Sequence, residues 1–289
     1  MKKVLIIGAG AIGRGFLAPL LHDLNFEISF LDKNIDLVKK LNKKKTYIAA
    51  ITNNKSYIFK KIVIKKAFNL KEKLNIKKYN LVFCCVGPKQ CEKIAVRLKD
   101  AKVIISCEND FFSVTKIKKK SRNKNVFFGI PDVITSSTAP KNLLKIDELT
   151  TVSEQGELIL EKGKYNISKK IKQVNRSELD QHWRAKLFIH NAPHAILAYL
   201  GHLKKYRYIH DAMMDENIKK IVIGSMREVT NGVIKAKYVS KKFGTYYMNK
   251  EIKRFSNKLL FDPINRVARE PIRKLGKENR IILALRVAQ

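Results

Sequence analysis

The sequence predicts an α/β protein in which a mainly parallel sheet forms the N-terminal domain and the C-terminal domain is all-α. Short apolar runs that end in small or polar residues recur between residues 3 and 160, a pattern typical of strands buried on both faces of a parallel sheet. From about residue 178 onward, apolar residues recur with helical spacing instead. A chain of 289 residues with 45% hydrophobic content can bury two cores. We therefore predict domains at residues 1–178 and 179–289.

The first predicted element is a strand at residues 3–7, followed by the glycine-rich sequence GAGAIG at residues 8–13. A helical pattern runs from residue 16 to residue 24, and a second apolar run, residues 27–31, ends at Asp32. Strand, GxGxxG turn, helix, strand and acid follow one another in the order of a Rossmann βαβ unit, which binds a dinucleotide. The N-terminal domain is therefore predicted to be a Rossmann domain.

Each position of this turn has a physical reason. Gly8 permits the tight turn, Gly10 lets the backbone approach a pyrophosphate, and Gly13 lets helix and strand pack closely. The free N–H groups at the helix N-terminus meet the phosphates. Asp32 lies about 20 positions after the last glycine and can accept hydrogen bonds from both ribose hydroxyls. Its charge would repel a 2′-phosphate, which favours NAD over NADP, although Lys33 leaves some use of NADP open.

Further strands are predicted at residues 57–64, 80–86, 102–106, 125–129 and 149–160. The second of these runs ends in Gly87, at the carboxyl end of a strand, where open α/β sheets bind their ligands. A helix is predicted at residues 89–98, and the polar segment 161–177 is predicted to be an irregular connection. The residues predicted to contact NAD are Gly8, Ala9, Gly10, Ile12, Gly13, Asp32 and Gly87.

In the C-terminal domain, helical patterns are predicted at residues 197–203, 209–223 and 225–238, and an arginine-rich run follows at residues 266–274. Before them, Lys186, Asn191 and His194 bring a lysine, an amide and an imidazole close together. In an α-helix, Lys186 and His194 would lie about 80° apart around the axis, with Asn191 beyond His194 on the same side. The three side chains could then converge on one small ligand. The alternative is a buried amphipathic helix with a snorkelling lysine and a core histidine.

Pro193 lies within this segment and leaves two local structures open. It could kink the helix, because it removes a donor and clashes with the carbonyl group four residues back. Alternatively, Asn191 could cap a new helix that holds Pro193 in its first turn, where the missing N–H costs nothing.

The composition is strongly basic, with 60 Lys and Arg against 25 Asp and Glu and a formal net charge of +35. Such a surface attracts polyanions, so nucleic-acid binding has to be considered. However, the lysines are spread along the whole chain, and no nucleic-acid-binding motif accompanies them. We interpret the charge as compositional drift typical of AT-rich genomes and do not expect a nucleic-acid partner.

Four cysteines, Cys84, Cys85, Cys91 and Cys107, show neither a CxxC pair nor zinc-type spacing. We expect them to be reduced, and we expect no metal. No stretch approaches the roughly 20 apolar residues of a membrane span, and the first apolar run is interpreted as a strand rather than a signal peptide. We therefore expect a cytoplasmic protein without a membrane partner, and the choice between monomer and homo-oligomer stays open.

Several of these segments together resemble the long-chain polyol, or mannitol, dehydrogenase family. The resemblance rests on GAGAIGRGF at residues 8–16, the Lys-x4-Asn-x2-His spacing from Lys186, IHDAMMDE at residues 209–216 and RVAREPIRKL at residues 266–275. It implies a Rossmann domain followed by a helical substrate domain, here shortened at its C-terminal end. It also implies reversible, metal-independent hydride transfer between mannitol 1-phosphate and NAD, giving fructose 6-phosphate and NADH.

The resemblance also implies roles for individual residues. Lys186 would be the general acid/base, Asn191 would polarise the reacting oxygen, and His194 would hold a neighbouring hydroxyl. Asn109 would face the same oxygen from the Rossmann side. Lysine suits the role because burial or nearby cations can lower its pKa towards neutrality, which makes it a base that needs no metal.

Arginines are the candidates for binding the substrate phosphate, because guanidinium groups match phosphate oxygens in pairs. Arg266, Arg269 and Arg273 are spaced by three and four residues and could share one face of a helix. The alternative is a solvated basic face, and we expect one or two of the three to contact a ligand.

Two other functions are compatible with the sequence. The chain could be a related polyol or hexuronate dehydrogenase that acts on a non-phosphorylated substrate. It could instead be a truncated, non-catalytic remnant that binds NAD or nucleic acid.

Overall fold

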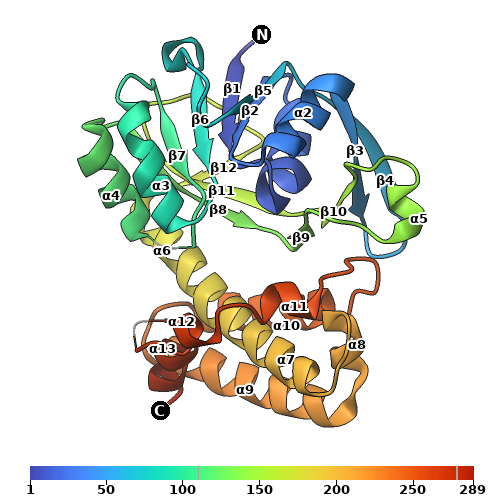
Figure 1. The fold of residues 1–289 in the computed structure, drawn as a ribbon. Coiled ribbons are helices and arrows are strands. Elements are labelled where there is room, and N and C mark those ends of the chain that lie inside the picture. The colour runs from blue at the N-terminus through green and yellow to red at the C-terminus, as the bar shows by residue number, and fades with distance from the viewer. Residues whose placement is uncertain (110, 278) are drawn as a thin grey trace. The chain divides into compact units, whose positions relative to one another are not determined.

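The computed structural model describes residues 1–109, 111–277 and 279–289. The chain forms two compact units, Met1–Arg176 and Ser177–Gln289 (Figure 1). The first unit is α/β and the second is helical. Among the described residues, no helix combines the length and the apolar character that crossing a bilayer requires.

The first unit is built on an eight-stranded sheet with the order β12-β11-β8-β7-β6-β1-β2-β5. The strands from β8 to β5 are parallel, whereas β11 runs antiparallel to β8. Residues 4–6 of β1 are fully buried, as expected for a strand covered on both faces. The bounds are β1 Lys3–Ile7, β2 Glu27–Asp32, β5 Lys66–Asn69, β6 Leu81–Cys84, β7 Ile104–Ser106, β8 Val126–Asp132, β11 Glu157–Glu161 and β12 Lys172–Val174.

A second, four-stranded sheet in the same unit has the order β4-β3-β10-β9. Its strands are β3 Thr46–Thr52, β4 Tyr57–Val63, β9 Thr135–Ser136 and β10 Thr151–Glu154. The predicted strand at residues 57–64 therefore exists as β4, but it pairs antiparallel with β3 and lies outside the large sheet. Its partner β3, with the sequence TYIAAIT, was not predicted.

The prediction of one strand at residues 149–160 is wrong. The segment forms β10 and β11, which belong to different sheets. The strand is interrupted around Gly156, where an added Cβ would lie 2.5 Å from the Cβ of Val133. Only glycine fits this close approach. The segment 161–177 is also more regular than predicted, because it contains β12 and the start of a helix.

Helices cover the large sheet. A π-helix, Ala11–Leu17, leads directly into α1 Ala18–Asp23. Its residues Phe16 and Leu17 join the main apolar core with Phe30 of β2. The other helices of this unit are α2 Ile35–Lys44, α3 Pro88–Ala95, α4 Phe112–Ser121 and α5 Lys141–Leu144, and 3-10 turns lie at Ile76–Lys78 and Val96–Leu98.

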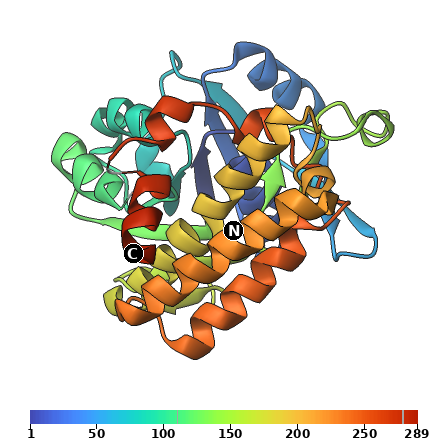
Figure 2. The same ribbon diagram turned by 90° about the horizontal axis from the view of Figure 1, so that it is seen from below.

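The second unit begins with a continuous helical segment. It comprises α6 Arg176–Arg184, whose first residue belongs to the first unit, a π-helix at Ala185–Asn191, and α7 Ala192–Leu203. Two long helices, the orange ribbons α9 and α10, lie side by side (Figure 2). The remaining bounds are α8 Ile209–Met214, α9 Glu216–Lys235, α10 Lys241–Phe255, α11 Ile264–Val267, α12 Pro271–Lys274 and α13 Arg280–Ala288.

Helix α9 is one element where the sequence suggested a break near residue 224. The actual break lies at Asp215, whose Oδ1 accepts the N–H groups of Asn217 (3.0 Å) and Ile218 (3.1 Å). This is an N-cap, which satisfies donors that the first helical turn would otherwise leave free. Gly232 of α9 allows close packing, because a Cβ there would lie 2.0 Å from the carbonyl oxygen of Val287 in α13.

Candidate active site

A cavity of about 430 Å³ lies where β1, β2 and β6 end in the first unit. The residues that line it include Gly8, Gly10, Asp32, Lys33, Lys93 and Arg97. This position, at the carboxyl ends of neighbouring parallel strands, is where open α/β sheets bind ligands. The glycine turn and the acid that the sequence singled out therefore border the same cavity.

The three glycines of the turn are required for three different reasons. Gly8 has a φ of +102°, and a Cβ there would lie 2.7 Å from the carbonyl oxygen of Cys85. A Cβ on Gly13 would lie 1.9 Å from the carbonyl oxygen of Gly8. Nothing lies within 4 Å of a Cβ built on Gly10, which borders the cavity. Gly8 and Gly13 are thus needed for the fold, whereas Gly10 keeps space open for a ligand.

Backbone hydrogen bonds hold the carboxylate of Asp32 in place. Its Oδ2 accepts the N–H of Ala9 (2.7 Å), and its Oδ1 accepts the N–H of Asn34 (2.8 Å). Each carboxylate oxygen can accept a further hydrogen bond. Asp32 is therefore oriented at the cavity wall, and the bond to Ala9 also fixes the glycine turn to the end of β2.

Arg14 is a structural residue of this turn that the sequence predictions missed. It is 5% exposed, and its guanidinium donates to the carbonyl oxygens of Ala9 (2.7 Å), Leu149 (2.6 Å) and Ser137 (3.2 Å). Burial lowers the pKa of this group. Arg14 thereby ties the turn to the chain around β9 and β10. The only signal in the sequence was an arginine between Gly13 and Gly15.

The other residues predicted to contact the cofactor have different surroundings. Ile12 packs against the apolar core. Gly87 has a φ of +91° and precedes α3, and its N–H donates to Oε1 of buried Glu108 (2.9 Å). Neither residue is part of the cavity lining. Asn109 is itself exposed and lies three residues after the end of β7, next to buried Glu108.

In the second unit, the π-helix explains the spacing of Lys186, Asn191 and His194. A π-helix bonds residue i to residue i+5, so Asn191 lies about one turn after Lys186. The chain is α-helical from Ala192, and residues three apart share a face of an α-helix. The three side chains therefore follow one stripe, and all are less than 10% exposed. The α-helical angles used in the sequence prediction do not apply to residues 185–191.

Of the two local structures left open for Pro193, the structure adopts neither in full. Pro193 lies in the first turn of α7, and the residues that precede this turn, 185–191, are themselves π-helical. Asn191, however, has helical dihedral angles (φ −65°, ψ −34°), and its side chain makes no capping bond. The helix continues through the segment in the π register. The amide of Asn191 is therefore not used as a cap.

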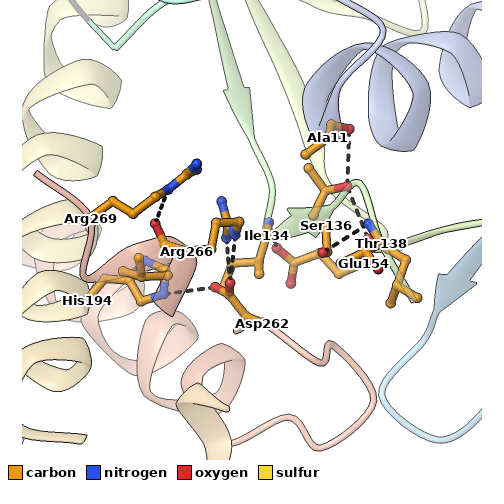
Figure 3. Close-up of polar contacts among 12 residues, drawn as sticks. Ala11, Ile134, Ser136, Thr138, Glu154, His194, Asp262, Arg266 and Arg269 are labelled. Carbon is orange, nitrogen blue, oxygen red and sulfur yellow. Dashed lines mark hydrogen bonds and ion pairs between the residues drawn. The ribbon is translucent and has the colours of Figure 1, made fainter. Parts of the chain in front are cut away.

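His194 lies next to Asp262, which was not among the predicted site residues, and Asp262 in turn contacts Arg266, which was. Its Nε2 lies 3.0 Å from Oδ2 of Asp262, and Oδ1 of Asp262 accepts from Nε (3.1 Å) and Nη2 (2.5 Å) of Arg266 (Figure 3). Burial by itself would raise the pKa of Asp262, but the charge of Arg266 and the polar contacts with His194 and Arg266 hold it well below its usual range. Asp262 is thus a buried carboxylate that stays ionised.

A second buried histidine–carboxylate contact lies beside this one. Nδ1 of His190 lies 2.5 Å from Oε2 of Glu251, and the other oxygen of Glu251 accepts from Arg254. The rings of His190 and His194 have centroids 5.0 Å apart. No local pattern could have revealed these pairs, because His190 and Glu251 are 61 positions apart in the chain.

The prediction that the three arginines share a helix face is wrong. Residues 264–267 and 271–274 form two separate short helices, and Glu270 between them has a φ of +58°. Arg266 is paired with Asp262, and Arg273 donates to Oε2 of Glu270 (2.8 Å). Arg269 is exposed, and its Nε donates to the carbonyl oxygen of Arg266 (3.1 Å).

One buried cation near this run was not among the predicted site residues. Lys274 is 6% exposed, and its Nζ donates to the carbonyl oxygen of Val267. Burial, reinforced by the charges of Arg280 and Arg273, lowers the pKa of Lys274 to about 8. The C-terminal part of this unit therefore holds several cations at short range.

Two protein-family models match the chain. The mannitol dehydrogenase Rossmann domain matches residues 2–126, and the mannitol dehydrogenase C-terminal domain matches residues 178–289. The mannitol-1-phosphate 5-dehydrogenase of Clostridium acetobutylicum is 33% identical to the chain, over 99% of the chain and 81% of that protein. That of Buchnera aphidicola subsp. Acyrthosiphon pisum is 31% identical, over 97% of the chain and 80% of that protein.

Solved structures share the fold at low sequence identity. The ternary complex of Pseudomonas fluorescens mannitol 2-dehydrogenase with NAD and D-mannitol has a TM-score of 0.74 and 17% identity, over 92% of this chain and 71% of that one. Substrate-free D-sorbitol dehydrogenase has a TM-score of 0.68 and 18% identity, over 92% of this chain and 72% of that one. The family models and the sequence relatives together establish that this chain belongs to the mannitol dehydrogenase family.

Proposed function

We propose that the chain is an NAD-dependent mannitol-1-phosphate 5-dehydrogenase, which interconverts mannitol 1-phosphate and fructose 6-phosphate. The main support is the stripe of Lys186, Asn191 and His194, where a π-helical turn followed by an α-helix aligns a base, an amide and an imidazole. The relatives with more than 30% identity carry this name.

The cavity of the first unit fits a dinucleotide. Gly10 leaves room at the wall for a pyrophosphate to approach the backbone, and Asp32 presents oriented carboxylate oxygens to ribose hydroxyls. Because the carboxylate would repel a 2′-phosphate, NAD is favoured over NADP. When bound, NAD would supply the electron chemistry by accepting hydride from the alcohol carbon.

The proton chemistry is assigned to the chain's own side chains. In the oxidation direction, Lys186 removes the hydroxyl proton, and in the reduction direction it donates one to the carbonyl oxygen. The amide of Asn191, one turn further along the helix, donates to the oxygen on which charge develops. Asn109 would contribute a second amide, and His194 would bind a neighbouring hydroxyl. A metal has no role in this scheme.

Arg269 is the best candidate for a contact with the substrate phosphate. Its Nε donates to a backbone carbonyl, and its terminal nitrogens have no partner among the described residues, whereas Arg266 and Arg273 are paired with carboxylates. A guanidinium with both Nη groups available can bind two phosphate oxygens at once. Of the three arginines, we therefore propose Arg269 as the residue that binds the substrate phosphate, and Arg273 as the next candidate.

The test is NADH oxidation, followed by its absorbance, with fructose 6-phosphate, with fructose, and with NADPH in place of NADH. Turnover that needs both the phosphate and NADH is expected. Lys186→Ala should lower kcat about 10²- to 10⁴-fold, since it removes the general acid. Lys219→Ala is the control, because it removes a partly exposed lysine from α9 and should leave kcat unchanged.

Two outcomes would contradict the proposal. Turnover of fructose as fast as of fructose 6-phosphate would indicate a polyol dehydrogenase that acts on non-phosphorylated substrates. An absence of turnover in folded protein that binds NADH would indicate a non-catalytic NAD-binding protein.

A further inference from the structure

Asp262 has no role in the proposed chemistry, yet its surroundings are those of a built site. Its side chain is 3% exposed and lies between His194 and Arg266 (Figure 3). The contacts are 3.0 Å to Nε2 of His194 and 2.5 Å to Nη2 of Arg266. A buried carboxylate is costly unless its charge is paired and its oxygens have polar partners. Here Oδ2 faces His194 and Oδ1 faces Arg266.

The backbone around Asp262 is held at both ends. The preceding residue, Phe261, has a φ of +46°, in the left-handed region that costs a bulky residue about 1–3 kcal/mol. The carbonyl oxygen of Asp262 accepts the N–H of Ile209 (3.0 Å), and Pro263 forms a β-bridge with Tyr208. The loop between α10 and α11 is thus clamped to residues 208–209, in a strained conformation that presents the carboxylate to His194.

The ring of His194 is fixed as a result. Phe255 stacks on it with a centroid distance of 5.1 Å, and the Asp262 carboxylate binds its Nε2 edge. An ionised carboxylate can only accept, so the 3.0 Å approach of Oδ2 favours a proton on Nε2, and in the neutral ring Nδ1 then carries the lone pair. Nδ1 makes no hydrogen bond with any residue in the described part of the chain.

We propose that Asp262 is a positioning residue, which holds His194 as its Nε2–H tautomer so that Nδ1 accepts a hydrogen bond from a substrate hydroxyl next to the reacting carbon. Arg266 then serves to fix Asp262 and does not bind the substrate phosphate. The inference rests on the proposed function for the identity of that hydroxyl. The arrangement of carboxylate and imidazole follows the same logic as in other sites where an acid sets the tautomer of a working histidine.

Steady-state kinetics of Asp262→Asn and Arg266→Gln test this role. Asp262→Asn should lower kcat with fructose 6-phosphate about 10- to 100-fold and leave the KM for NADH unchanged. Arg266→Gln should lower kcat with fructose 6-phosphate without a large rise in the KM for this sugar, because it acts through Asp262. Asp180→Asn is the matched control, since Asp180 and Arg184 form the same i,i+4 pair on a more exposed helix face.

Two kinetic outcomes would overturn the inference. One is an Asp262→Asn enzyme as active as Asp180→Asn. The other is an Arg266→Gln enzyme that loses only its preference for the phosphorylated sugar, which would make Arg266 a phosphate ligand.

The tautomer itself can be measured without turnover. Nitrogen NMR of the imidazoles, with His194 assigned by its loss in His194→Gln, should show the Nε2–H form in the wild type and a loss of that bias in Asp262→Asn. An Nδ1–H tautomer in the wild type would refute the inference, even if Asp262→Asn failed to fold. A wild type without turnover would refute the proposed function, and the NMR result would still decide the role of Asp262.

Discussion

At the scale of residues, two carboxylates near the proposed sites are held in a fixed orientation by neighbouring polar groups. The carboxylate of Asp32 accepts two backbone N–H groups, and that of Asp262 is shared between His194 and Arg266. In both cases the acid is oriented before any ligand binds. Such pre-organisation matters because a group that is already fixed loses little freedom when it binds a substrate or cofactor.

The role of Asp32 predicts a change in cofactor preference. Asp32→Ser should raise the KM for NADH about 10- to 100-fold, since hydrogen bonds to a charged group contribute about 1.5–3 kcal/mol. It should also narrow the preference for NADH over NADPH, because the charge that repels a 2′-phosphate is removed. Both are measured by the rate of absorbance loss with each cofactor. Asp36→Ser, in the first turn of α2, is the control, and an unchanged cofactor preference in Asp32→Ser would count against the assignment.

At the scale of elements, two of the segments proposed to bind ligands contain a π-helix. One follows the glycine turn at Ala11–Leu17, and the other carries Lys186 and Asn191. A π-turn shifts the register of a helix by one residue relative to the α form, and such turns are frequent at functional sites. In the second unit this shift aligns side chains five positions apart, which an α-helix would separate.

The glycine turn predicts different effects for two similar substitutions, one on stability and the other on NADH binding. Gly13→Ala should lower the free energy of unfolding by about 1–3 kcal/mol or more, because its Cβ would meet the backbone oxygen of Gly8 at 1.9 Å. Gly10→Ala should leave stability unchanged, since nothing lies within 4 Å of its Cβ, and should weaken NADH binding. Denaturant unfolding and NADH fluorescence titration measure the two effects. Equal losses of stability would refute this distinction.

The cap of α9 predicts a stability effect that depends on pH. The hydrogen bonds from Lys204 and from the backbone of Ile218 lower the pKa of Asp215 to about 2. Because this pKa is lower in the folded than in the unfolded chain, the stabilisation is present above about pH 4 and is lost as the pH falls towards 2. Asp215→Ala should therefore lower the melting temperature by about 2–4 °C at pH 7. The difference from wild type should shrink below pH 4, and a constant difference down to pH 2 would contradict the linkage.

For the molecule as a whole, the charge of +35 raises the question of polyanion binding. Since the cations are dispersed, we expect only non-specific binding of duplex DNA, with a Kd of about 1 µM or weaker at 0.15 M salt. Fluorescence anisotropy of a labelled duplex at several salt concentrations measures this. Submicromolar binding that persists at about 0.5 M salt would contradict the prediction and would indicate a dedicated nucleic-acid site.

Local patterns predicted the elements more reliably than their pairing. The order from β1 through the glycine turn to β2 could be predicted, because periodicity and turn chemistry are encoded within about 30 residues. The sheet that contains β4, and the split of residues 149–160 between two sheets, could not. The pairing of these strands depends on which strands, far apart in the sequence, lie beside them in the fold. The split also depends on the close contact at Gly156.

The sequence by itself determined the family, the Rossmann fingerprint and the spacing of Lys186, Asn191 and His194, because each is carried by residue types at short, countable separations. Only the tertiary structure decided that Asp262 contacts His194, that Arg266 is committed to that carboxylate, and that a π-turn aligns the three site residues. The physical reason is that buried charges select their partners by packing and desolvation. These depend on how distant segments meet and leave no periodic trace in the chain.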